Sequence, residues 1–543
     1  MKTRKVYEQL PNYYYRPEFE QCLNCGGPLI RSHTAWHKTI RSIQGSRKVY
    51  NQAYRCRDKE TCGEPERVYR SIYADGLSLP YYTYGLDVIV TIGQARLRQH
   101  RTIAEIHTAL NQATPPIAIS EREVLYLFDV YLLLLACSHG RRLEQYRAEI
   151  EANGGVVLAI DGAKPEKGQP GLYIFRDAVT GCRLHTAVLY SADRDSLVRE
   201  LQVVVALGLP IQAVISDDEQ ATVVAVAQLW PDKPHGLCHI HFLKVVQKPV
   251  YEADRQLATA LRKPLRALNK IERLCQQSPE LIDSLSDDQK QALRRYLDAL
   301  RAVLLTKGQS PFRLVGTTIF EQLARLTVSL EQSQSQQAHE VLTRLQQVTQ
   351  PHQFYQVDYE RVQRQQDWFL GLADLLNVST TSLHHWATKT GAEVAQEVDD
   401  YLQGLACLSD ELTEDAPFFD HMYRCTTRWA DGLYWTYEIL ALPRTNNDLE
   451  ADIGAIKEQY RRITGRRALK DYLMRYGPYL AFDDDQDDPE ELLQWFAEVE
   501  HQQFINEKAK LESMRETLRN MQRFRHDPLA FLAETERLWT QSD

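Results

Sequence analysis

The sequence predicts a multidomain protein that combines an α/β core with a large all-α region. Its 543 residues exceed what a single hydrophobic core usually organises. Within residues 151–245, short apolar runs alternate with amphipathic stretches, which is typical of strands and helices in turn. Residues 246–440 show only helical periodicity. These observations favour an α/β domain followed by an all-helical insertion.

The composition is that of a globular protein without a membrane-spanning segment. Hydrophobic residues make up 43% and charged residues 25% of the chain. No uninterrupted apolar run approaches the roughly 20 residues that cross a bilayer. The first residues, MKTRKVYEQL, are basic but lack the apolar region of a secretory signal. We therefore expect a cytoplasmic protein with no membrane partner.

The net charge of −9 does not exclude a nucleic-acid partner, because the charges are unevenly distributed along the chain. Acidic residues are concentrated in residues 483–491 (DDDQDDPEE), whereas residues 1–70 contain 14 Lys and Arg against 7 Asp and Glu. Local patches, and not the total charge, decide what DNA encounters. The N-terminal region is therefore a candidate DNA-binding surface.

Residues 1–80 are predicted to form a zinc-ribbon-like domain. Four of the ten cysteines cluster here, and the others are scattered singly, which indicates reduced thiols and one metal site instead of a disulfide framework. The predicted Zn²⁺ ligands are Cys22, Cys25, Cys56 and Cys62. The alternative is that they are unrelated buried thiols, with His33 or His37 as spare ligands.

Residues 81–150 are predicted to form a helix-turn-helix-like module with helices over 86–98, 103–111 and 121–136. Two sites resemble capping boxes, Thr102 with Glu105 and Ser120 with Glu123. The alternative is a helical spacer that does not touch DNA. The candidate phosphate ligands in this module are Arg96, Arg98 and Arg101.

Residues 151–245 are predicted to form the first part of an RNase H-like mixed sheet. VVLAIDG, LYIFRDAVTG and CRLHTAVLYS are three strands, with a turn at Thr180-Gly181. A helix (RDSLVRELQVVVALG), a strand (IQAVISDD), another helix and the short strand HGLCHI follow. Three strands, then helix, strand, helix and strand, is the order of an RNase H-like domain.

Two acidic residues end apolar strands of this domain. Asp161 closes LAIDG and Asp217 closes AVISD, where an unpaired charge would be costly unless it faced a ligand. Divalent ions that activate water for phosphodiester chemistry prefer carboxylate oxygens. Asp218 is the main rival for the second position. Each acid also has a structural alternative: Asp161 at a turn, and Asp217 as a helix N-cap.

Two further segments resemble a known family. VISDDEQATVVAVAQLWPDKPHGLCHIHFLKVV resembles the catalytic core of Mutator-like transposases and their bacterial insertion-sequence relatives, including a Cys-x-x-His pair at Cys238 and His241. RTNNDLEADIGAIKEQYRRITGRR resembles the family's final Asn-x-x-Glu motif, which carries the third carboxylate onto Glu450. As a structural alternative, Asn447 and Glu450 also fit a capping box.

This resemblance implies a DDE-type DNA transposase. Asp161, Asp217 and Glu450 would hold Mg²⁺ or Mn²⁺, with Cys238, His241 and Asp218 as accessory residues. It also implies double-stranded DNA, both element ends and target, as partner, a homodimer or larger assembly, and a bacterial, nucleoid-associated location. Two alternative interpretations are a domesticated, transposase-derived DNA-binding protein without catalysis and an RNase H-like nuclease that cuts DNA without strand transfer.

The remaining predictions concern segments around the core. Residues 441–482 would supply the final catalytic helix, and residues 483–543 would form an acidic loop and a helical tail. The tail carries a stripe of apolar residues that would pack either on the body of the protein or on a partner helix: Leu511, Met514, Leu518 and Met521. Tryptophans of the insertion are candidates for base stacking, with core packing as the alternative: Trp368, Trp386, Trp429 and Trp435. Basic residues after Glu450 are candidate DNA ligands: Arg461, Arg462, Arg466, Arg467 and Lys470.

Overall fold

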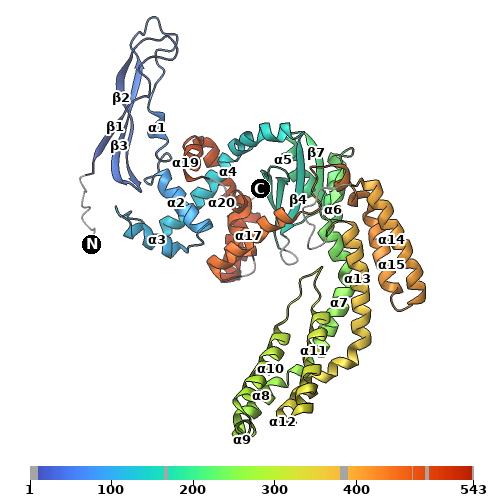
Figure 1. Cartoon of the computed structure of the whole chain (residues 1–543). Coiled ribbons are helices and arrows are strands. Elements are labelled where there is room, and N and C mark those ends of the chain that lie inside the picture. The colour runs from blue at the N-terminus through green and yellow to red at the C-terminus, as the bar shows by residue number, and fades with distance from the viewer. Residues whose placement is uncertain (1–9, 164–168, 379–388, 467–468, 484–487, 541–543) are drawn as a thin grey trace. The chain divides into compact units, whose positions relative to one another are not determined.

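The computed structural model describes residues 10–163, 169–378, 389–466, 469–483 and 488–540 (Figure 1). The chain divides into two compact units. The first comprises Met1–Pro210 with Asn447–Asp543, and the second comprises Ile211–Asn446. The division falls inside residues 151–245, the segment predicted to form the first part of one RNase H-like core. Both strands and helices occur, as predicted, and helices predominate.

The first unit begins with a mixed three-stranded sheet, order β1-β3-β2. Its strands are β1 (Asn12–Tyr15), β2 (Leu29–Ser42) and β3 (Gly45–Cys56), with β1 parallel and β2 antiparallel to β3. Ile40, Val49 and Ala53 are buried on one face of this sheet. The long β2–β3 hairpin lies at the N-terminal end of the unit, and the short α1 (Ile72–Asp75) packs against β3 (Figure 1).

Three helices follow: α2 (Leu86–Leu97), α3 (Ile103–Gln112) and α4 (Glu121–Ala152). The capping box of Thr102 and Glu105 is confirmed, and Ser120 accepts the backbone N–H of Glu123 as an N-cap.

The predicted end of the third helix near residue 136 is wrong, because Leu143 and Ile150 extend its buried face. Among the described helices, α4 alone is long and apolar enough to span a membrane, yet 61% of its apolar window is buried inside the protein. Length and apolar composition are shared by core helices, and the burial of this window is typical of one.

The first unit also contains an antiparallel meander, order β6-β5-β4. Its strands are β4 (Val156–Ala163), β5 (Gly171–Asp177) and β6 (Arg183–Leu189), followed by α5 (Arg194–Val205). The predicted turn is confirmed: Gly181 has a φ of +75°, and the buried Asp177 accepts the N–H and the hydroxyl of Thr180. The Asp177 carboxylate also accepts the N–H of Val157, which ties the turn to β4.

The C-terminal part of the chain returns to the first unit as helices. They are α17 (Asn447–Thr464), α18 (Lys470–Tyr476), η2 (Gly477–Ala481), α19 (Pro489–Ala497), α20 (His501–His526) and α21 (Pro528–Thr540). Helix α17 packs against β4, and α20 packs against α4 and α18. Leu511 is buried, and Met514 lies against Gly477, which supports the alternative in which this stripe packs on the body.

The second unit begins with β7 (Ile211–Ser216), α6 (Gln220–Leu229) and β8 (His235–Leu237), in which β7 and β8 are parallel. Helices follow: α7 (His239–Leu265), α8 (Leu268–Gln277), α9 (Pro279–Asp283), α10 (Asp287–Leu305), α11 (Val315–Gln336), α12 (Glu340–Thr349), η1 (Gln350–Tyr355), α13 (Gln356–Leu375), α14 (Gly391–Glu411), α15 (Ala416–Leu433) and α16 (Trp435–Glu438). Helix α7 contributes to two apolar clusters, one with α13–α15 and one with α8 and α10–α12.

The tryptophans of this unit differ in exposure. Trp368 and Trp429 are buried in the first of these clusters, as the core-packing alternative predicts. Trp435 is 40% exposed and stays a candidate for base stacking. Trp386 lies outside the described residues.

Candidate functional site

The four N-terminal cysteines form one cluster. Their sulfur atoms all lie within 4.8 Å of one another, with Sγ–Sγ distances of 3.8 Å between Cys22 and Cys62 and 3.4 Å between Cys25 and Cys56. Four sulfurs bound tetrahedrally to one ion through bonds of about 2.3 Å are separated by about 3.8 Å. The cluster can therefore hold a metal ion.

Local backbone geometry positions these thiols. The N–H of Gly26 donates to the carbonyl of Cys22 at 2.8 Å, and Gly26 adopts a φ of +72°, which an L side chain rarely allows. Cys56 ends β3 opposite Leu29, and the N–H of Cys62 donates to the carbonyl of Asp58. The Cys22–Cys25 turn and the Cys56–Cys62 loop are thus held together by the β2–β3 hairpin.

A tyrosine hydroxyl supports the cluster. The Tyr69 hydroxyl lies 3.3 Å from Sγ of Cys22; this hydrogen bond, together with weaker ones from Cys25 and Asn24, lowers the pKa of the Cys22 thiol to about 6, whereas burial raises the pKa of Cys56 to about 12. Metals bind the thiolate form, so the Tyr69 contact favours binding. The proposed spare ligands do not belong to the cluster: His33 contacts Ser32, and His37 stacks on Tyr50.

The first unit holds two of the predicted catalytic carboxylates. Asp161 follows five buried residues of β4, is itself half-buried, and accepts the N–H of Gly162. Glu450 lies half-buried on α17, the helix that packs against β4. Because α17 begins at Asn447, Glu450 occupies the fourth helical position, one beyond the N3 place of a capping box. Both the catalytic interpretation of Glu450 and the capping-box alternative stay predictions.

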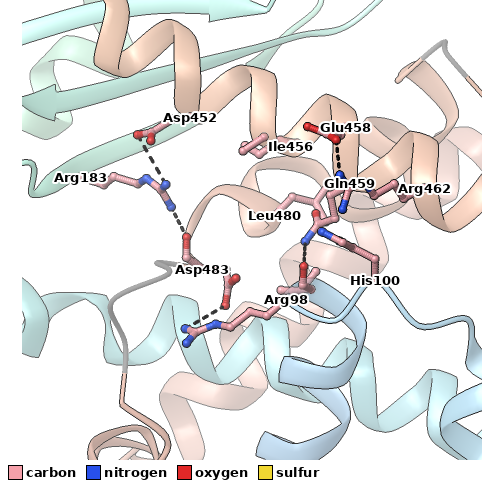
Figure 2. Close-up of a pocket in the computed structure, with 12 residues that line it drawn as sticks. Arg98, His100, Arg183, Asp452, Ile456, Glu458, Gln459, Arg462, Leu480 and Asp483 are labelled. Carbon is pink, nitrogen blue, oxygen red and sulfur yellow. Dashed lines mark hydrogen bonds and ion pairs between the residues drawn. The ribbon is translucent and has the colours of Figure 1, made fainter.

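An ion-pair cluster ties α17 to the meander (Figure 2). Asp452 lies 2.9 Å from the guanidinium of Arg176 on β5 and 3.5 Å from that of Arg183 on β6. Arg183 also donates to the carbonyl of Ala481 at 2.8 Å and to that of Asp483. Sequence reasoning did not identify this cluster, although an arginine inside the apolar run LYIFRD is a signal that a buried partner exists.

A pocket of about 430 Å³ opens beside this cluster (Figure 2). It is lined by Leu97, Arg98, His100, Arg183, Asp452, Ala455, Ile456, Glu458, Gln459, Arg462, Leu480 and Asp483. Two of the predicted DNA-binding arginines lie here, and each faces an acid: Arg98 is 3.9 Å from Asp483, and Arg462 is 2.5 Å from Glu458. The pocket therefore combines positive and negative charge and is not a dedicated anion site.

The other candidate DNA ligands differ in exposure. Arg96 is buried, at 9% exposed, and donates to the carbonyl of Arg101, so it supports the turn after α2 instead of facing solvent. The side chains of Arg101, Arg461 and Arg466 are exposed, whereas that of Lys470 is half-buried. Arg466 also lies 3.2 Å from Asp471. Arg467 lies outside the described residues.

The second unit brings Asp217 together with the Cys-x-x-His pair. In the parallel pairing of β7 and β8, Ser216 lies opposite Leu237, so the next residues, Asp217 and Cys238, are neighbours. His241 follows in the first turn of α7, and its Nδ1 lies 2.8 Å from Oδ1 of Asp217. Ligand atoms of Asp217, Cys238 and His241 all lie within 4.8 Å of one another. The sequence did not predict that a carboxylate joins this pair.

The charges around Asp217 distinguish it from Asp218. Burial alone would lower the pKa of His241, but hydrogen bonds with Asp217 and Cys238 outweigh burial and raise this pKa to about 10. Asp218 instead contacts Arg428 of α15, and burial raises the pKa of its carboxyl despite this arginine. Asp218 is thus engaged by a different cation.

The comparisons with known proteins assign no family. No protein-family model matches the sequence, and the search of curated proteins gave no match. Asp161 and Glu450 belong to the first unit, and Asp217 belongs to the second. That the three carboxylates act in one centre stays a prediction.

Proposed function

We propose that the protein is a DDE-type DNA transposase. One observation supports this most: α17 packs against β4. Two predicted catalytic carboxylates, Glu450 and Asp161, are therefore carried by neighbouring elements of one unit, although the whole second unit lies between them in the chain. Acids that are far apart in the chain but are carried by neighbouring elements of the fold are typical of a metal-dependent active site.

In this proposal Asp161, Asp217 and Glu450 hold Mg²⁺ or Mn²⁺. Such ions activate a water for hydrolysis of the phosphodiester and stabilise the charge on the transferred phosphoryl group. Cleavage leaves a 3′-hydroxyl, which then attacks target DNA by the same in-line displacement. The Asp452 ion-pair cluster holds the helix that carries Glu450, so it would position this carboxylate.

The N-terminal regions would bind the element's ends. Four cysteine sulfurs within 4.8 Å of one another favour Zn²⁺ at the cysteine cluster, which would make the β1–β3 sheet a zinc ribbon. The exposed Arg101, with Arg461 and Arg466 on the other segment, would contact phosphates. Pairing of two ends calls for a homodimer or larger assembly.

The test is a DNA-joining assay. The full chain is incubated with a labelled fragment that carries the DNA flanking its own gene, together with a target plasmid, with and without Mg²⁺. A joined product supports a transposase. Hydrolysis without joining indicates a nuclease, binding alone indicates a DNA-binding regulator, and either outcome overturns the proposal.

Variants connect the assay to the carboxylates. We expect Asp161→Ala and Glu450→Ala to lower joining by about 10³-fold or more, as the loss of a catalytic group commonly does. Asp448→Ala is the matched control, because Asp448 is an exposed acid on the same helix, and it should leave joining unchanged. Full activity of Asp161→Ala would contradict the assignment.

A further inference from the structure

The Cys-x-x-His pair and Asp217 together have the composition of a second metal site in the second unit. Asp217 directly follows β7, Cys238 directly precedes α7, and His241 lies in the first turn of that helix. The backbone fixes this arrangement, because the N–H of Cys238 donates to the carbonyl of Ser216 at 2.9 Å. The three side chains therefore converge through strand pairing and helix geometry, and not through a flexible loop.

The donor set favours a different ion from the one proposed for catalysis. One sulfur, one imidazole nitrogen and one carboxylate oxygen lie within 4.8 Å of one another. Magnesium prefers oxygen ligands alone, whereas zinc accepts sulfur, nitrogen and oxygen together. Three protein ligands and one open position, filled by water or substrate, describe a catalytic type of zinc site.

The surroundings of Cys238 fit a metal-bound sulfur. Its side chain is fully buried, and its sulfur accepts the backbone N–H of Asn446 at 3.4 Å. Donors of this kind orient metal ligands from outside the coordination sphere. A buried sulfur beside a carboxylate and an imidazole, with a backbone donor behind it, is more elaborate than core packing requires.

We infer that Asp217, Cys238 and His241 bind a zinc ion. A carboxylate has two oxygens, so Asp217 can ligate zinc through Oδ1, which faces His241, and leave its other oxygen for magnesium. On binding, zinc would replace the proton that lies between Nδ1 of His241 and Oδ1 of Asp217. It would also replace any proton on the Cys238 thiol, and both protons would pass to solvent. The inference shares Asp217 with the proposed function but does not depend on DNA cleavage.

The test is the zinc content of the purified full chain, measured by mass spectrometry after extensive dialysis. We expect two zinc ions per chain in the unaltered protein and one in Cys238→Ser and in His241→Ala. Cys25→Ser should also retain one, because it affects only the N-terminal cluster. The matched control is Cys425→Ser. Cys425 is a half-buried cysteine of the same unit that does not belong to the trio of Asp217, Cys238 and His241, so this variant should retain two zinc ions.

Cobalt substitution identifies the ligands. Co²⁺ bound to a thiolate absorbs strongly in the near ultraviolet, so Cys238→Ser in the Cys25→Ser background should abolish this band. His241→Ala guards against a folding defect, because His241 is partly exposed. Two zinc ions retained in both Cys238→Ser and His241→Ala would overturn the inference, as would a single zinc in the unaltered chain that Cys25→Ser removes.

The two proposals can fail separately. Asp161→Ala should abolish joining while two zinc ions remain, because Asp161 is not part of the trio. If Cys238→Ser and His241→Ala leave the zinc content unchanged, and the unaltered protein joins DNA in the presence of magnesium, the zinc inference is wrong and the transposase proposal stands. If two zinc ions are present and no DNA is cut or joined, the reverse holds.

Discussion

The cysteine cluster and the predicted catalytic carboxylates differ in how the chain builds them. All four cysteines lie within 41 residues, Cys22 to Cys62, and one hairpin brings them together. The carboxylates are divided: Asp161 and Glu450 belong to the first unit, and Asp217 belongs to the second. The cluster therefore depends on one local fold, whereas the proposed carboxylate centre would need residues of both units.

This difference predicts different sensitivities. A metal bound by a small domain supplies much of that domain's folding free energy, because the unfolded chain has no preformed site. A carboxylate on a helix with its own apolar core can be removed at little cost in stability, while chemistry is lost. The cluster should therefore respond to change mainly in stability, and the carboxylates mainly in activity.

The largest expected effect is the loss of stability that would follow removal of a metal ion from the cysteine cluster. Structural zinc contributes on the order of 10 kcal/mol of apparent binding free energy in small metal-dependent domains. A strong chelator, or Cys25→Ser, should unfold the β1–β3 sheet, and limited proteolysis should then cut between residues 10 and 62. The rest of the first unit should resist the protease. Unchanged resistance of the sheet after metal removal would show that its hydrophobic core suffices.

The next effect concerns the link between α17 and the meander. Asp452→Asn should destabilise the first unit by about 2–3 kcal/mol, because Arg176 and Arg183 lose a charged partner. The displaced helix should also lower kcat for joining while the KM for DNA stays nearly constant, since Asp452 is proposed to position Glu450 and not to touch DNA. Urea unfolding and joining kinetics measure the two effects. Equal changes in kcat and KM would contradict a positioning role.

The sequence predicted those features that neighbouring residues determine. The apolar run Val156–Ile160 indicated β4, and the spacing of Thr102 and Glu105 indicated a capping box, since both depend on interactions within a few residues. The zinc-ligand spacing likewise indicated a cluster that the structure shows as one group of sulfurs.

Long-range contacts could not be predicted in this way. Asp452 meets Arg176 although hundreds of residues separate them, and no periodicity records such a pairing. Asp217 joins Cys238 and His241 only because β7 and β8 pair in one register. Helix α4 extends past its expected end, and this extension makes long-range contacts: Arg142 donates to the carbonyl of Phe482, and His139 lies 3.1 Å from the carbonyl of Leu184. In each case tertiary packing supplied the deciding interaction.

A smaller effect should appear in acid. Burial beneath β6 lowers the pKa of His139 to about 4, and its Nε2 lies 3.1 Å from the carbonyl of Leu184. The unfolded chain protonates this imidazole near pH 6.5, so it binds more protons than the folded state between pH 6.5 and 4. The stability from a neutral His139 is therefore present above pH 6.5 and is lost as the pH falls toward 4. Urea midpoints across this range, compared with those of His139→Gln, should show a shallower slope for the variant.

The smallest effect is expected at the rim of the pocket beside α17. Glu458 and Arg462 form an exposed i,i+4 pair at 2.5 Å, and such pairs contribute about 0.3–0.5 kcal/mol. Glu458→Gln should therefore leave the free energy of unfolding almost unchanged, in contrast to Asp452→Asn on the same helix. Because it releases Arg462 from its acid, it should also strengthen DNA binding at low salt. Fluorescence anisotropy with a labelled duplex measures this gain, and equal affinity of the two proteins would remove Arg462 from the set of DNA ligands.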